Sequence, residues 1–130
     1  MNVVDSSGWL EFFADGPNAS FFAPALHKPA ELLVPTVSIY EVFKRILQQK
    51  EETDALRAVA AMQQGTVLPL DEGLALSAAR LSIELKLPLA DSVMLAAARG
   101  ANAVLWTQDA DFKGMDGVRY VETPKQRPGA

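Results

Sequence analysis

The chain contains no cysteine, a single histidine and no long apolar run. The absence of cysteine excludes a disulfide framework, a thiolate metal site and a cysteine nucleophile. The histidine, His27, lies between two prolines in PALHKPAEL, where a solvated loop or helix-end role is favoured over a catalytic one. Any metal site is therefore expected to consist of oxygen ligands, with His27 as the one other donor available.

Apolar runs of the roughly 20 residues that a membrane-spanning helix needs are also missing. The first residues lack the basic start and long apolar middle of a signal peptide. We therefore expect a soluble, cytoplasmic protein with no membrane contact. Positive charge is scarce as well, since 12 Lys and Arg stand against 16 Asp and Glu and the net charge is -4. This argues against a broad basic surface for nucleic acid, although bound cations can supply a positive field locally.

What is present fits one globular unit. The 130 residues are 49% hydrophobic and 22% charged, which excludes a fibrous or disordered chain and is close to the usual size of one domain. No repeat or low-complexity linker divides the sequence. We expect a single domain over residues 1–123, followed by a polar tail over residues 124–130.

Short apolar segments alternate with segments of helical periodicity. Strands are predicted at NVVD, ELLVP, TVLPL, AVLW and VRYV, and helices at SSGWLEFF, within residues 16–31, and over residues 36–50, 52–64, 72–85 and 89–99. Ser6 or Ser7 is predicted to cap the first helix and Asp71 the fifth, while Gly100 is placed just past the last one. This alternation predicts an α/β fold in three layers, with helices on both faces of a mainly parallel sheet of about five strands.

Acidic residues follow the predicted strands at the edge where such sheets bind ligands. Asp5 ends the first strand, and Asp109 and Asp111 follow the fourth. Asp91 lies in the first turn of the helix over residues 89–99, on the same face as its apolar residues. Burying a carboxylate there costs free energy unless a positive charge or a hydrogen-bond donor lies next to it. Glu41 differs, because it lies on the side of its helix opposite the apolar residues. It can reach the cleft at the carboxyl edge of the sheet only if that helix borders this edge.

Each acid taken alone also has an ordinary structural explanation. Asp5 or Asp91 could cap a helix, and Glu41 could pair with Arg45 one turn further on. The two acids after the fourth strand could bond to the backbone of their own turn. Taken together, the acids favour a metal site, because three separate segments place acidic residues at the same carboxyl edge of the predicted sheet. Carboxylates at close quarters repel one another unless a cation lies between them, and all-oxygen ligands suit Mg²⁺ or Mn²⁺. Metal-assisted phosphodiester hydrolysis is the chemistry that such a site supports.

Four segments together carry a family resemblance that covers nearly the whole chain: VVDSSGWLEFF, VPTVSIYEVFKRIL, LPLADSVMLAAA and LWTQDADFKGMDGVRYV. In this order and approximate spacing they resemble the PIN domain family and, within it, the VapC-type toxin ribonucleases of bacterial toxin-antitoxin pairs. The resemblance implies that four acids are catalytic and metal-binding and that three further residues support them. These are Asp5, Glu41, Asp91 and Asp109, with Asp111, Ser6 and Thr107 in support.

The same resemblance implies an endoribonuclease that needs Mg²⁺ or Mn²⁺, hydrolyses RNA with a metal-activated water and is restrained by a cognate antitoxin. It also implies a homodimer, with apolar residues of Phe12–Leu33 and Glu52–Met62 as the interface and antitoxin groove. Four basic residues are candidates for guiding the RNA backbone, although solvated surface charge would explain each one singly: Lys44, Arg45, Lys113 and Arg119.

Other interpretations fit the residues less well. A haloacid-dehalogenase-like phosphatase needs a second aspartate at the position of Ser7, and a Toprim nuclease needs its glutamate at a strand end, whereas Glu41 lies in a predicted helix. The alternative that stays open is a non-catalytic PIN-like binding module whose acidic pocket recognises basic residues of a partner.

Overall fold

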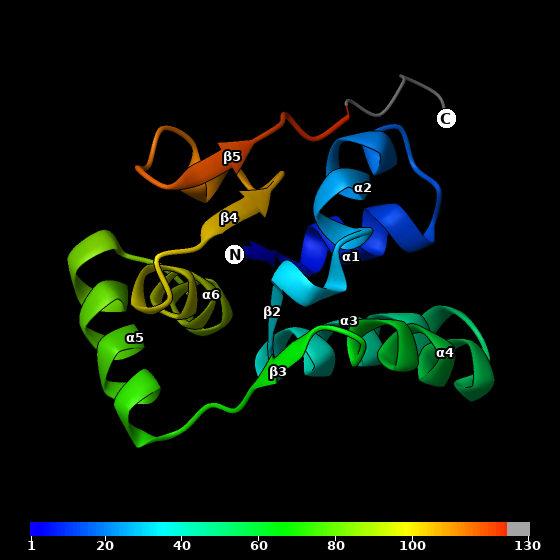
Figure 1. Cartoon of the computed structure of the whole chain (residues 1–130), viewed down its shortest axis with the longest axis horizontal. Coiled ribbons are helices and arrows are strands. Elements are labelled where there is room, and N and C mark those ends of the chain that lie inside the picture. The colour runs from blue at the N-terminus through cyan, green and yellow to red at the C-terminus, as the bar shows by residue number, and fades with distance from the viewer. Residues whose placement is uncertain (125–130) are drawn as a thin grey trace.

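The computed structural model describes residues 1–124 of the chain (Figure 1). Helices and strands alternate along this part of the chain, as the sequence predicts. In chain order they are β1 (Asn2–Val4), α1 (Ser6–Phe13), α2 (Ala19–Leu26), the 3-10 helix η1 (Pro29–Glu31), β2 (Leu32–Pro35), α3 (Thr36–Gln49), α4 (Glu52–Met62), β3 (Thr66–Leu68), α5 (Glu72–Leu85), α6 (Leu89–Gly100), β4 (Val104–Thr107), the 3-10 helix η2 (Ala110–Phe112) and β5 (Val118–Tyr120).

The strands form one sheet in which every neighbouring pair is parallel, in the order β3-β2-β1-β4-β5. The chain builds outward from β1 through β2 and β3, and later places β4 and β5 on the other side of β1. The strand order therefore reverses between β1 and β4, and open parallel sheets bind ligands beyond the carboxyl ends of the strands at such a point. Asp5 lies at this point, because its backbone N–H donates to the carbonyl of Trp106 in β4 at 2.9 Å.

Helices cover both faces of the sheet, with α1 to α4 on one side and α6, backed by α5, on the other (Figure 1). Successive residues of a strand point to opposite faces, so the central strands supply both cores. Val4 and Trp106 belong to the core beneath α1 to α4, whereas Val3 and Leu105 pack with Met94 of α6. The predicted three-layer α/β/α architecture with a five-stranded parallel sheet is confirmed.

Every helix and strand predicted from the sequence is present, but two details of the helix ends are wrong. Asp5, and not Ser6 or Ser7, is the N-cap of α1, and both serines lie in the first turn of that helix. Gly100 is the last residue of α6, and the C-cap is Ala101. Asp71 caps α5 as predicted, since its carboxylate accepts the backbone N–H of Leu74 at 2.9 Å.

Two further predictions concern the C-terminal tail and membrane-spanning helices. The predicted polar tail over residues 124–130 lies, from residue 125 onward, outside the described residues. Within the described part of the chain, no helix is long and apolar enough to cross a bilayer.

The packing of α1 against the sheet leaves no room for a side chain at Gly8. A Cβ atom there would lie 2.6 Å from the ring of Phe22 in α2 and 2.7 Å from the side chain of Val4 in β1. We predict that Gly8→Ala lowers the free energy of unfolding by about 1–3 kcal/mol, because overpacking outweighs the better helix propensity of alanine. Chemical denaturation followed by circular dichroism measures the change.

Gly73→Ala is the matched control, because Gly73 lies in the first turn of α5 and a Cβ atom there would only meet the Asp71 carboxylate at an ordinary 3.7 Å. This substitution should leave stability unchanged or raise it by up to about 1 kcal/mol. Equal effects of the two substitutions would show that α1 does not pack on the sheet as described.

Candidate functional site

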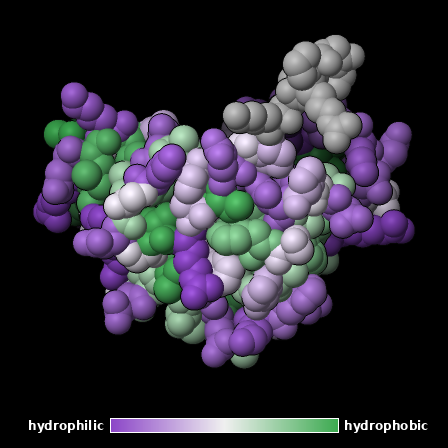
Figure 2. All heavy atoms as spheres, turned by 90° about the horizontal axis from the view of Figure 1, so that it is seen from above, coloured by the Kyte–Doolittle hydropathy of each residue, from purple (hydrophilic) through white to green (hydrophobic). Residues whose placement is uncertain are grey.

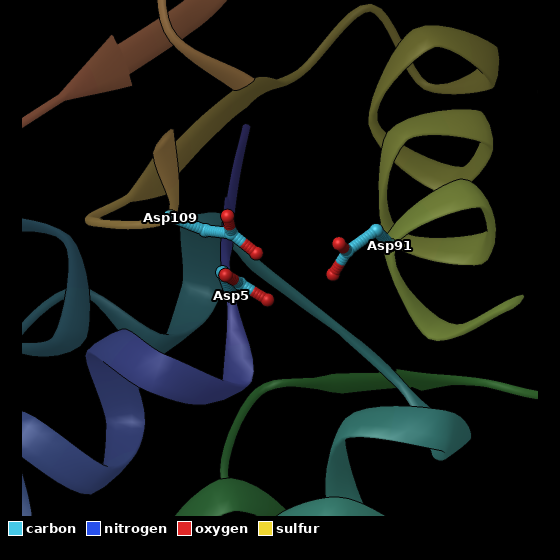
Figure 3. Close-up of side chains that lie close together, drawn as sticks. All are labelled: Asp5, Asp91 and Asp109. Atoms are coloured by element: carbon cyan, nitrogen blue, oxygen red, sulfur yellow. The ribbon is translucent and has the colours of Figure 1, made fainter. Parts of the chain in front are cut away.

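Three carboxylates from separate segments meet at the carboxyl edge of the sheet. One oxygen each of Asp5, Asp91 and Asp109 lies within 4.8 Å of the other two. Asp5 follows β1, Asp109 follows β4, and Asp91 lies in the first turn of α6. Figure 3 shows Asp5 and Asp109 on one side of the gap and Asp91 pointing toward them from α6. The structure thus brings together three of the four acids that the sequence predicts for the site, and these three form the acidic cluster.

Asp5 is held in one orientation by three hydrogen bonds. Its Oδ1 accepts the backbone N–H of Ser6 at 2.8 Å, while its Oδ2 accepts the hydroxyls of Ser7 at 3.0 Å and Thr107 at 2.9 Å. The residue is only 4% exposed. A buried carboxylate with several donors has few rotamers left, so the position of Asp5 is set before any ligand arrives.

Thr107 also connects Asp5 to the segment that carries the other acids. Its hydroxyl oxygen accepts the backbone N–H of Asp109 at 2.9 Å, and the Asp109 carboxylate in turn accepts the backbone N–H of Asp111 at 2.9 Å. Asp111 itself is exposed and lies outside the acidic cluster. The predicted supporting position of Thr107 therefore has a geometric basis, whereas Asp111 contributes to this bonding through its backbone.

Burial and mutual repulsion make the charged form of two of these acids unfavourable. Burial raises the pKa of Asp5 to about 6, and the charge of Asp109 adds a smaller rise. The hydrogen bonds from Thr107, Ser7 and Ser6 act in the opposite direction and lower this pKa. Burial also raises the pKa of Asp91 to about 7, and the charges of Asp5, Asp109 and Asp111 add to the rise. A cation bound between the carboxylates would offset both effects.

Glu41 is close to the acidic cluster without being part of it. It is partly buried on α3, and its Oε1 accepts the hydroxyl of Ser6 at 2.7 Å. It lines the same cavity of about 360 Å³ as Asp5, Asp91 and Asp109. We call this cavity the acid pocket. The helix α3 therefore borders the carboxyl edge of the sheet, which is the condition under which Glu41 could belong to the site.

Two of the four basic candidates lie beside the acidic residues. Lys44 and Arg45, both on α3, line the acid pocket. Lys113 and Arg119 do not line it, and their charged groups lie over aromatic rings of β5 and β4, at 5.9 and 4.8 Å from the ring centroids. Of the four candidates, only the pair on α3 lies at the acid pocket.

Two features of the site were not predicted from the sequence: the hydrogen bond from Ser7 to Asp5 and the contacts of Gln108. Ser7 was recoverable, because a hydroxyl two residues after an N-cap lies in the first helical turn, within reach of the cap. Gln108 is 8% exposed, and its amide accepts from Asn18 at 3.0 Å and donates to Glu11 at 3.3 Å. Asn18 is 90 residues and Glu11 97 residues away along the chain, so no local pattern could reveal this network.

This network holds the segment that joins β4 to Asp109. The Gln108 carbonyl accepts the hydroxyl of Thr123 at 2.6 Å, and Asn18 also donates to the carbonyl of Glu122 at 2.9 Å. The backbone on either side of Gln108 is thereby attached to α1, to the start of α2 and to the segment after β5. Asp109 therefore follows a residue whose side chain and carbonyl are both hydrogen-bonded to distant segments.

The donor set fits a small divalent cation. Mg²⁺ binds oxygen at about 2.0–2.1 Å, so two ligands on opposite sides of one ion lie about 4.2 Å apart. The three carboxylate oxygens lie within 4.8 Å of one another, so they can share one ion after a small inward movement or with one link through water. All the ligands are hard oxygen donors, which suits Mg²⁺ or Mn²⁺ and disfavours zinc.

Comparisons with known proteins agree with this geometry. The family model described as PIN domain matches residues 3–118 of the chain. No curated protein matches it significantly. Solved structures do: a toxin-antitoxin complex from Klebsiella pneumoniae is 22% identical, with a TM-score of 0.78 over 92% of this chain and 96% of the other.

Two further solved structures share the fold. The VapC20 toxin of Mycobacterium tuberculosis, described as cleaving the sarcin-ricin loop, is 18% identical, with a TM-score of 0.73 over 89% of this chain and 95% of that one. VapBC2 from Rickettsia felis, bound to a DNA fragment from its promoter, is 12% identical, with a TM-score of 0.71 over 93% of this chain and 97% of that one. At such identities the likeness concerns the fold.

The raised pKa values of Asp5 and Asp91 make a prediction about the metal-free protein. The folded state holds these protons to higher pH than the unfolded chain does, so the contribution of these two groups to stability is fully present below about pH 4 and is lost as the pH rises through about 6 to 7. Asp91→Asn removes one repelling charge and should raise the free energy of unfolding at about pH 7.5 by on the order of 1 kcal/mol, after allowance for the partial exposure of Asp91.

Thermal unfolding in EDTA measures this as a rise in Tm of roughly 3–5 °C at about pH 7.5 that vanishes near pH 4, where Asp91 is neutral. Asp116→Asn, at an exposed position outside the acidic cluster, is the control and should change Tm at neither pH. A loss of stability in Asp91→Asn at both pH values would mean that the carboxylates do not repel one another in the folded protein.

Proposed function

The chain belongs to the PIN domain family, and on this premise we propose that it is a Mg²⁺- or Mn²⁺-dependent endoribonuclease and the toxin of a toxin-antitoxin pair. The observation that carries the proposal is the acidic cluster, in which Asp5, Asp91 and Asp109 come together from three segments. The fold neighbour from Mycobacterium tuberculosis, described as a toxin that cleaves the sarcin-ricin loop, supports RNA as the substrate. We further propose that residues 1–123 act as one domain and that the protein works in the cytoplasm.

Each residue of the site has a role in this proposal. Asp5, Asp91 and Asp109 would hold the metal, and Glu41, which lines the same pocket from α3, would add a fourth carboxylate. When bound, Mg²⁺ or Mn²⁺ supplies positive charge that activates water and offsets charge on the phosphoryl group. Ser6, held against Glu41, and Thr107, which donates to Asp5, keep the carboxylates aligned.

The basic residues of α3 complement the acids. Lys44 and Arg45 line the acid pocket, where they can bind the phosphate whose ester bond is cut. In this hydrolysis the oxygen of water bonds to phosphorus, the bond to the leaving ribose oxygen breaks, and that oxygen takes up a proton. No side-chain nucleophile is needed, which agrees with a chain that has no cysteine.

The partner proposal rests on a second, uncharged groove. A cavity of about 470 Å³ lies between α1, α2 and α4, and its lining is dominated by Trp9, Phe12, Phe13 and Leu26. We call it the aromatic groove. All of its lining except Trp9 and Gln64 falls within the two segments that the family resemblance assigns to partner binding. An apolar groove of this kind suits the hydrophobic face of a protein helix. We propose it as the antitoxin site.

A homodimer is also proposed. Apolar side chains are exposed on α5 and at the start of α6, where Leu76, Ile83 and Leu89 are 53, 84 and 72% exposed. Figure 2 shows hydrophobic atoms at the end of the molecule where α5 lies in Figure 1. This surface and the segments Phe12–Leu33 and Glu52–Met62 are alternative dimer contacts. Light scattering on a Leu76→Glu variant distinguishes them, because the variant should be monomeric only if the surface on α5 forms the dimer.

The nuclease proposal predicts cleavage that requires metal and the acidic cluster. Purified, antitoxin-free protein should cut labelled RNA with Mn²⁺ and lose the activity in EDTA. Asp5→Asn should lower the rate by more than about 100-fold, because even groups that only orient metal ligands are worth about 10- to 100-fold. Asparagine is also a good N-cap, so α1 should remain folded in this variant.

Asp116→Asn is the control for this experiment and should cleave RNA like the wild type. The alternative function, a non-catalytic binding module, predicts the opposite pattern. It would be favoured if the folded wild-type protein showed no EDTA-sensitive cleavage and behaved like Asp5→Asn.

The partner proposal predicts that a small reading frame beside the gene encodes the antitoxin. Ala61 is exposed on α4 and lines the aromatic groove, so Ala61→Glu places a charge there without disturbing the core. We expect this variant to lose co-purification with the co-expressed neighbour and to have a Kd raised by more than about tenfold. Calorimetry measures the Kd.

Ala60→Glu is the matched control, because Ala60 is exposed on the same helix but lies outside the lining of the aromatic groove. This variant should bind the neighbour with wild-type affinity. Equal affinities of the two variants would exclude the aromatic groove as the binding site.

A further inference from the structure

A third groove adjoins the acid pocket between α1, α3 and α4. Its volume is about 560 Å³. It shares Ser7, Leu10 and Arg45 with the acid pocket, so the two hollows form one continuous surface. We call it the cationic groove, because three basic residues lie along it: Arg45, Lys50 and Arg57.

The charges along the cationic groove favour an anionic occupant. The three basic side chains are exposed. The two acids in the lining, by contrast, already have roles within the fold. Glu11 accepts hydrogen bonds from the backbone of Asn18 and the amide of Gln108. Asp54 lies in the first turn of α4, where a negative charge stabilises the helix N-terminus. Three basic residues thus stand against two acids in this lining, one of which is engaged in hydrogen bonds, in a chain whose net charge is -4.

The remaining lining suits unpaired nucleotide bases. Leu10, Phe13 and Ile46 are partly buried and give the cationic groove an apolar floor against which a base can stack. Gln49 contributes an exposed amide to the lining, which can pair with a base edge. The apolar side chains, the amide and the exposed basic residues together form the kind of surface that binds single-stranded nucleic acid.

The aromatic groove offers a clear contrast. Acidic residues, lysine and arginine are all absent from its lining within the described part of the chain. Its polar lining consists of His27 and Gln64, and it shares Phe13 with the cationic groove but no residue with the acid pocket. The two grooves differ in chemistry, which argues for two different occupants.

We propose that the cationic groove holds the single-stranded RNA segment next to the phosphodiester that is cleaved. Arg45 binds a phosphate at the junction with the acid pocket, and Lys50 and Arg57 bind phosphates further along the strand. This proposal rests on the proposed function. It assigns the recognition of the strand to α3 and α4, rather than to Lys113 and Arg119.

Binding of a short fluorescein-labelled oligouridylate in EDTA tests the proposal without any cleavage, by fluorescence anisotropy. Arg57→Glu should raise the Kd by about tenfold and make the slope of log Kd against log salt shallower by about 0.7, the contribution of one single-strand phosphate contact. The matched control is Arg80→Glu, which makes the same charge change at an exposed position on α5 and should alter the Kd by less than about threefold.

A neutral substitution tests the shape of the cationic groove independently of charge. Gln49→Trp fills it with a large side chain, whereas Gln63→Trp places the same side chain at an exposed position outside its lining. We expect Gln49→Trp to weaken oligouridylate binding by about tenfold or more and Gln63→Trp to leave it unchanged.

Equal effects of Arg57→Glu and Arg80→Glu would overturn the proposal, because the effect would then come from net charge alone. The proposal would also be overturned if Arg57→Glu kept RNA affinity and instead lost the neighbour protein, which would make the cationic groove a protein site. The proposed function fails separately, if the wild-type protein shows no Mn²⁺-dependent cleavage. Because binding in EDTA does not depend on cleavage, the two failures can be told apart.

Discussion

The structure depends on one unfavourable interaction, the crowding of Asp5, Asp91 and Asp109 within 4.8 Å of one another. Burial and mutual repulsion raise the pKa values of Asp5 and Asp91, so the metal-free fold is under electrostatic strain at neutral pH. A chain selected only for stability would replace one of these acids with an amide. Their joint presence is explained by a ligand that reverses the repulsion, and a divalent cation is the simplest one.

The surrounding fold is organised to keep these acids in place. Asp5 serves both as the N-cap of α1 and as the most deeply buried acid of the cluster, so the start of the helix and the position of the carboxylate are fixed together. Thr107 links it to the loop of Asp109, and the network around Gln108 ties that loop to α1 and α2. Rigid placement of this kind allows a metal site to form with little reorganisation.

Three hollows with different chemistry lie around this centre. The acid pocket holds the carboxylates, the cationic groove continues from it with basic residues, and the aromatic groove is uncharged. Cleavage and strand recognition would then use one continuous surface, and restraint by a partner would use a neighbouring groove that shares no residue with the acid pocket. All three hollows are lined by α1, so an occupant of the aromatic groove could influence the acid pocket without entering it.

The sequence by itself determined the elements, the three-layer α/β class and the acids at the strand ends, because hydrophobic periodicity and strand-end position are local properties. It also placed Asp91 on an apolar stripe, and burial of that stripe follows from its spacing alone. Only the tertiary structure decided that β4 lies beside β1, which brings Asp109 to Asp5. It alone separated Lys44 and Arg45 from Lys113 and Arg119, and revealed the contacts of Gln108. Those outcomes depend on strand order and on side chains up to 97 residues apart, which no local pattern encodes.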